Sequence, residues 1–100
     1  MNRNKVLHDL TRLESLLQKH EVPYALVIRE LRSRLLVAQR PEALVAVRAD
    51  LQRLFSGGGM GSLSDVWISK RNGNVVDNET AANSELTKLR HALKSDVYED

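Results

Sequence analysis

The sequence predicts a mainly α-helical protein of about four helices, with one short β-hairpin between the third and the fourth helix. Leucine, valine and alanine recur every three or four residues over most of the chain, which is typical of amphipathic helices. Two prolines and a cluster of glycines separate these periodic segments. One hundred residues suffice for one hydrophobic core, so we expect a single domain spanning residues 1–100.

Residues 1–56 are expected to form a three-helix front. The first helix covers about 2–20 and stops before Pro23, which suits the first turn of the next helix because that position needs no backbone donor. The second covers about 23–39 and ends before Pro41, since proline disfavours a helical conformation in the residue preceding it. The third, 41–56, carries the clearest apolar stripe.

Residues 57–65 form a glycine-rich joint. Gly57 is expected to end the third helix, because glycine adopts a left-handed conformation without steric cost. Ser62 and Asp65 have the spacing of a capping box, which predicts one helical turn before residue 66. A phosphate-binding loop is disfavoured, since a helix rather than a strand precedes the glycines and no lysine follows Gly61.

The β-hairpin is predicted over residues 66–76. Two short apolar runs, 66–68 and 74–76, flank Asn72 and Gly73, and an Asn-Gly pair is a strong signal for a tight turn.

A C-terminal helix is predicted over residues 78–97, with Asn78 and Asn83 as alternative N-caps. The expected core combines the apolar stripes of all four helices. It consists of Leu10, Leu13, Leu17, Ile28, Leu31, Leu35, Leu44, Val47, Leu51, Leu54, Leu86, Leu89 and Leu93.

The sequence offers no set of residues for catalysis, for a cofactor or for a metal. The chain has no cysteine, and its three histidines lack the spacing of a metal site. No Gly-x-Ser-x-Gly nucleophile motif occurs. We therefore expect a non-enzymatic protein that needs no cofactor, with an orphan enzyme as an alternative.

The absence of cysteine and of long apolar runs predicts a cytoplasmic location and no membrane association. Charge is unevenly distributed: residues 1–56 carry ten basic and six acidic side chains, and residues 57–100 carry five and seven. Arg29, Arg32 and Arg40 are therefore candidates for contact with nucleic acid. The small net charge of +2 makes this the weaker alternative.

One stretch carries a resemblance to a known family. Residues 58–65 read GGMGSLSD, an apolar run follows, and residues 83–89 read NSELTKL. This arrangement resembles a family of small uncharacterised bacterial proteins with a GGMGS-x-x-D motif. In size and helical content the chain is also similar to immunity proteins of bacterial toxin systems. That similarity implies a cytoplasmic inhibitor that binds one cognate toxin.

The predicted function is accordingly that of a protein-binding module, specifically an immunity protein that neutralises a bacterial toxin. Met60 and Trp67 would supply apolar contact, since tryptophan is enriched at binding hot spots. Acidic residues would face a basic surface of the toxin: Asp65, Asp96, Glu99 and Asp100. The alternative is that Met60 and Trp67 belong to the core and that the glycine-rich joint is purely structural.

Overall fold

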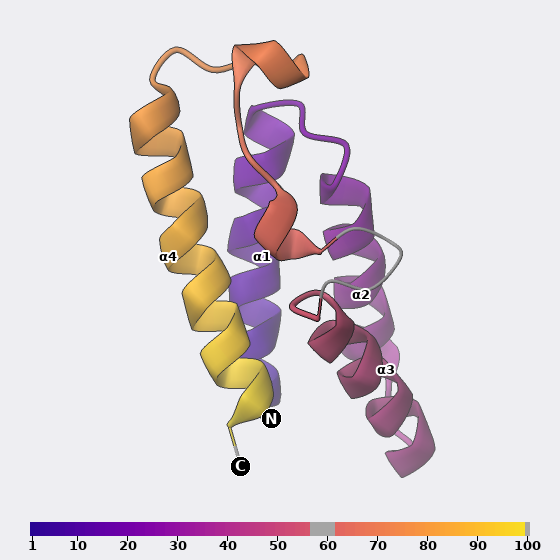
Figure 1. The fold of residues 1–100 in the computed structure, drawn as a ribbon. Coiled ribbons are helices and arrows are strands. Elements are labelled where there is room, and N and C mark those ends of the chain that lie inside the picture. The colour runs from indigo at the N-terminus through magenta and orange to yellow at the C-terminus, as the bar shows by residue number, and fades with distance from the viewer. Residues whose placement is uncertain (57–61, 100) are drawn as a thin grey trace.

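The computed structural model describes residues 1–56 and 62–99. This described part contains four α-helices and two single 3₁₀ turns. The helices are α1 (Arg3–Lys19), α2 (Ala25–Val37), α3 (Pro41–Arg53) and α4 (Glu79–Tyr98), and the turns are η1 (Leu63–Asp65) and η2 (Lys70–Asn72). Successive helices alternate in direction along an elongated body of 42 × 25 × 21 Å (Figure 1). The predicted mainly α-helical class is confirmed.

Helix α1 is the centre of the fold, with α2 on one side and α4 on the other (Figure 1). It begins at Asn2, whose side chain accepts a hydrogen bond from the backbone N–H of Lys5. Its apolar stripe is fully buried between the two neighbours. Helix α3, as long as α2, packs beside it and reaches the lower part of α4.

The expected core is confirmed with one qualification. Leu44 is only half-buried, and the other twelve predicted residues are buried. Leu63 and Ile68 join this core from the segment between α3 and α4. Because their side chains are fully buried, this segment is anchored to the helices at two points.

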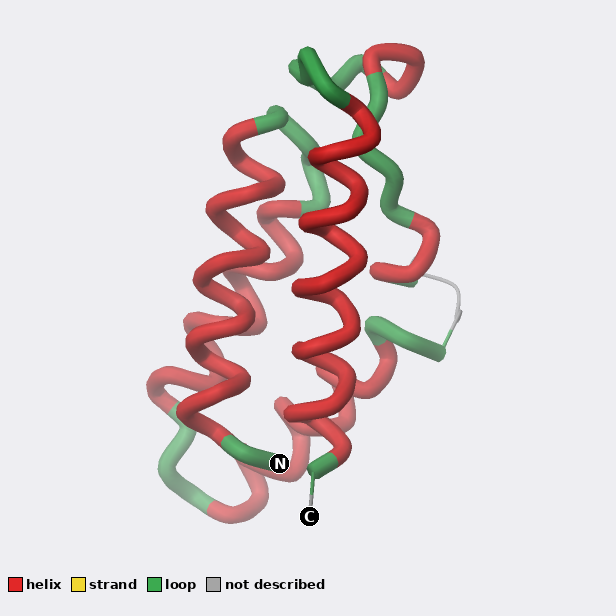
Figure 2. Tube along the Cα trace, turned by 90° about the vertical axis from the view of Figure 1, so that its left-hand side faces the viewer, coloured by secondary structure: helices red, strands yellow, loops and turns green. Residues whose placement is uncertain are grey.

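The predicted β-hairpin over 66–76 is wrong: none of the described residues forms a strand, and this segment is drawn as loop and one short turn (Figure 2). The Asn72–Gly73 turn does exist, with Gly73 at φ +84°, but it closes the 3₁₀ turn η2. One backbone hydrogen bond joins the two sides of the turn, from the N–H of Asn74 to the carbonyl of Ser69 at 3.0 Å, but other backbone donors of this segment bond elsewhere. The N–H of Ser69 donates to Asn74 Oδ1 at 3.0 Å, and that of Val75 donates to the carbonyl of His20 at 3.0 Å.

Two local predictions about helix starts can be compared directly with the structure. The helical turn predicted after Ser62 is η1: Ser62 Oγ accepts from the N–H of Ser64 at 3.0 Å, and Asp65 Oδ2 accepts from the N–H of Ser62 at 3.4 Å. Asn78 is the N-cap of α4, and Asn83 lies inside the helix. Gly57 lies outside the described residues. None of the described helices is both long and apolar enough to cross a membrane.

Candidate functional site

The segment from Ser62 to Asn78 crosses the face of the helices between the end of α3 and the start of α4 (Figure 1). Its first residues are attached to the end of α3. The hydroxyl of Ser62 and the N–H of Leu63 both donate to the carbonyl of Leu54, each at 2.7 Å. The carbonyl of Leu54 is thereby satisfied beyond the last turn of α3, and η1 has a fixed starting point.

Arg90 on α4 holds η1 from the other side. Its Nη1 donates to the carbonyls of Leu63 at 3.0 Å and of Val66 at 3.2 Å. A guanidinium can serve several acceptors at once because its donors have a fixed, planar arrangement. The backbone leading to Trp67 is therefore fastened to two helices.

Asn83, one helical turn beyond the start of α4, fixes the backbone just after Trp67. Its Oδ1 accepts from the N–H of Ile68 at 2.9 Å, and its Nδ2 donates to the carbonyl of Ile68 at 2.8 Å. The same Nδ2 donates to the carbonyl of Glu79. Since Asn83 and Ile68 are both buried, these bonds are shielded from competing water.

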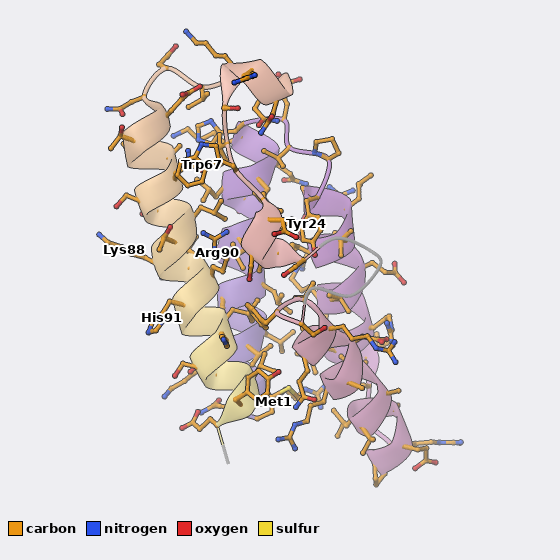
Figure 3. All side chains as sticks on the ribbon, viewed as in Figure 1. Met1, Tyr24, Trp67, Lys88, Arg90 and His91 are labelled. Atoms are coloured by element: carbon orange, nitrogen blue, oxygen red, sulfur yellow. The ribbon has the colours of Figure 1, made fainter. Side chains whose placement is uncertain are left out.

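Trp67 lies between these two anchors and its side chain is 55% exposed. Its carbonyl accepts a hydrogen bond from Asn72 Nδ2 at 3.0 Å. The indole lies over the upper part of α4 (Figure 3). The structure therefore presents a large aromatic side chain on a backbone that is hydrogen-bonded before, at and after this residue.

Asp65 lies on the same segment as Trp67, and both are exposed. Its carboxylate has a structural role in the capping box of η1. It also lies close to the half-buried Tyr24: burial, and then the negative charge of Asp65, raise the pKa of the Tyr24 phenol. Asp65 and Trp67 therefore share one segment but face different helices, because Tyr24 stands at the start of α2 and Trp67 lies over α4 (Figure 3).

The C-terminal acids lie at the other end of the molecule. Asp96 comes thirteen positions after Asn83, which lies beside Trp67, and this corresponds to a rise of about 20 Å along α4. The amino group of Met1 donates to the carbonyl of Glu99, and Figure 3 shows Met1 at the end of the bundle opposite Trp67. The predicted acidic residues therefore do not form one site with Trp67. Met60 and Asp100 lie outside the described residues.

Two of the arginines proposed for nucleic-acid contact are already paired. Arg29 Nε lies 3.1 Å from Glu14 Oε2, and Arg32 Nη2 lies 2.8 Å from Glu14 Oε1. Glu14 is buried on α1, where burial alone would raise its pKa, but the hydrogen bonds and charges of the two arginines lower it. Arg40 is exposed and makes no ion pair with another described residue. The three arginines do not form a continuous basic patch.

Sequence reasoning missed a pair of neighbouring carboxyls, the buried Asp9 on α1 and the half-buried Asp96 on α4. Burial, a hydrogen bond to Asp96 and the negative charge of Asp96 raise the pKa of Asp9 to about 7, against the smaller effects of Arg12 and Lys5. The available signal was position: Asp9 follows Val6 by three residues, which places it on the apolar stripe of α1.

The residues described contain no group of three or more histidine, aspartate or glutamate side chains that could hold a metal ion. No protein family, curated protein or solved structure matches the chain.

Proposed function

We propose that this protein is a non-enzymatic protein-binding module and that Trp67 is the centre of its binding surface. The observation that carries the proposal is that Trp67 has an exposed side chain on a hydrogen-bonded backbone. Its side chain is more than half exposed, while Asn72 and Asn83 hold the backbone at and after it. Burying a tryptophan against a partner removes a large apolar area from water.

Fixation of the backbone matters because binding must otherwise order the residues that make contact. A backbone segment already held in place loses less conformational entropy on binding, and more of the favourable free energy remains. Asp65 lies two residues away and is exposed, so a partner with a basic group beside an apolar hollow is complementary to this surface.

The specific partner that we propose is a bacterial toxin, which the protein would neutralise in the cytoplasm as an immunity protein. This part of the proposal is supported by the resemblance of the GGMGSLSD stretch to small bacterial proteins and by the similarity in size and helical content to immunity proteins. Met60, which belongs to that stretch, is proposed as a second apolar contact.

The test compares Trp67→Ala with Leu36→Ala, a matched control because Leu36 is 58% exposed on α2. Partners are captured from the native host with the wild-type protein and with each variant, and the affinity of the captured protein is then measured by titration calorimetry. We expect Trp67→Ala to weaken binding by roughly thirtyfold, equivalent to about 2 kcal/mol, and Leu36→Ala to have little effect.

A toxin partner is tested by co-expression. Wild-type protein should restore growth of cells that produce the captured partner, and Trp67→Ala should restore it less. A partner that both variants bind equally would overturn the role of Trp67. If the captured partner binds through Trp67 but is not toxic, the proposal of a binding module stands and the proposal of a toxin partner fails.

A further inference from the structure

The hairpin formed by α2 and α3 carries a groove along its outer side. Two adjoining hollows of about 570 and 470 Å³ lie between the helices, each within the size range of ligand-binding clefts. We call them together the α2–α3 groove. Val37 and Arg40 line the first hollow, Leu26, Val27 and Arg53 line the second, and Arg34 lines both.

The groove exists because α3 presents small side chains toward α2. Ala43 and Ala46 line the first hollow and leave the space between the helices unfilled. Val37, which lines the same hollow, remains 74% exposed as a result, and Leu26 in the second hollow is 64% exposed. Exposed apolar residues gathered along a groove are typical of an interaction site.

Basic groups stand at the two ends of the groove. Arg40 precedes the first residue of α3, and Arg53 is the last helical residue, so about 20 Å of helix separates them. Arg53 shares Asp50 with Arg34, which leaves this trio with a net positive charge. Glu30 is the other acidic residue in the lining.

The hairpin as a whole is basic. Residues 24–54 carry a net charge of +3, but two of their six arginines are paired with Glu14 on α1. The lining of the groove itself holds three arginines and two acidic residues, a net charge of +1. A second copy of the protein bound at this groove through a twofold axis would bring two such surfaces together, which like-charge repulsion disfavours. An acidic partner is favoured by the same charges.

We propose that the α2–α3 groove binds an acidic amphipathic helix of a partner protein. The helix lies along α2 and α3, with its apolar residues in the two hollows and acidic residues near Arg40 and Arg53. Grooves that accept helices hold the apolar residues at positions i, i+3, i+4 and i+7 of the bound helix. Trp67 itself does not line the groove, although Tyr24, which lines the second hollow, lies close to Asp65.

The test uses a synthetic 16-residue helical peptide with leucines at that spacing and glutamates on the opposite face, labelled with fluorescein. A second peptide has lysine in place of every glutamate. Binding is measured by fluorescence anisotropy at low and high salt, and the contact residues are mapped by NMR chemical-shift changes in the protein. We expect the acidic peptide to bind at least tenfold more tightly than the basic one at low salt.

The variants come in matched pairs that add the same charge at similarly exposed positions. Leu26→Glu and Val37→Glu lie in the groove and should each weaken peptide binding by about tenfold or more. Leu36→Glu and Val45→Glu are controls, because these residues are 58% and 68% exposed and do not line the groove. Arg40→Gln should weaken binding and reduce its salt dependence.

Several outcomes would overturn the proposal: no chemical-shift change with millimolar peptide, equal binding of the basic peptide, or equal effects of groove and control variants. Self-association in sedimentation equilibrium that only Leu26→Glu and Val37→Glu abolish would assign the groove to a second copy. Trp67→Ala should leave peptide affinity unchanged, so this proposal can fail or succeed independently of the Trp67 surface.

Discussion

The side chain of Asn83 hydrogen-bonds to both backbone polar groups of Ile68, at 2.9 Å to its N–H and 2.8 Å to its carbonyl. These are the two groups that a neighbouring β-strand would satisfy. One amide on α4 therefore takes the place of a strand partner. The next residue, Ser69, has an extended backbone with φ −155° and ψ 153°, although none of the described residues belongs to a sheet.

We predict that Asn83→Ala destabilises the protein by about 2–4 kcal/mol, because it leaves the buried N–H and carbonyl of Ile68 without their side-chain partner. Urea denaturation at pH 7 measures this change. Ser84→Ala is the control, since Ser84 is exposed on the same turn of α4 and should change stability by less than about 0.5 kcal/mol. Equal effects of both substitutions would show that Asn83 contributes only through helix propensity.

The helices could be predicted from the sequence because their signals are local. The apolar stripes and the caps Asn2, Asn78 and Ser62 depend only on residues within about one turn. The hairpin failed for the opposite reason. Its turn signal at Asn72–Gly73 was correct, but whether the flanking residues pair with each other was decided by Asn83, fifteen residues from Ile68 in sequence.

The candidate site could be predicted only in part, for a similar reason. Trp67 was proposed as a binding residue because of its residue type alone. Its 55% exposure in the structure shows that it is not part of the core. The pairing of Glu14 with Arg29 and Arg32 depends on the relative position of α1 and α2. The sequence fixes no such register between helices. The α2–α3 groove could not be predicted for the same reason. The only signal in the sequence was that α2 contains more apolar residues than the four that are buried in the core.

Gly73 provides a second test of the segment after Trp67. Its φ of +84° lies in the left-handed region, and an added Cβ would meet no atom within 4 Å. Gly73→Ala should therefore destabilise the protein by about 1 kcal/mol through backbone conformation alone, and Gly73→Asn should cost less because asparagine tolerates this region. Thermal unfolding measures both. A larger loss for asparagine than for alanine would contradict this explanation.

Glu14 should make stability depend on pH in the acidic range. Its pKa is lowered in the folded protein, so the stability it contributes is present above its unfolded value of about 4.3 and is lost as pH falls through the folded value. Glu14→Gln should destabilise by about 1–2 kcal/mol at pH 7, since the arginines are partly exposed. The difference from wild type should shrink below about pH 4.

The measurement for Glu14→Gln is urea denaturation at pH 7 and at pH 3. Glu30→Gln is the control, because Glu30 is exposed on α2 and makes no ion pair with another described residue. A loss of stability that is the same at both pH values would mean that Glu14 acts by packing rather than by its charge.

Asp9 should have the opposite effect on stability, and at higher pH. Its pKa rises to about 7 in the folded protein, above an unfolded value of about 3.9. The folded state therefore binds more protons between these values, and stability is lost as pH rises through the window. No donor among the described residues reaches the buried Oδ2, so a hydrogen bond to Asp96 requires a proton between the two carboxyls.

Asp9→Asn removes this titration while keeping the size of the side chain. We expect the variant to be more stable than wild type at pH 8, by on the order of 1–2 kcal/mol, and close to it at pH 4. Asp77→Asn is the control, because Asp77 is exposed before α4. Chemical denaturation from pH 4 to pH 8 measures the dependence. If wild type and Asp9→Asn lost stability equally across this range, ionisation of Asp9 would not be the cause.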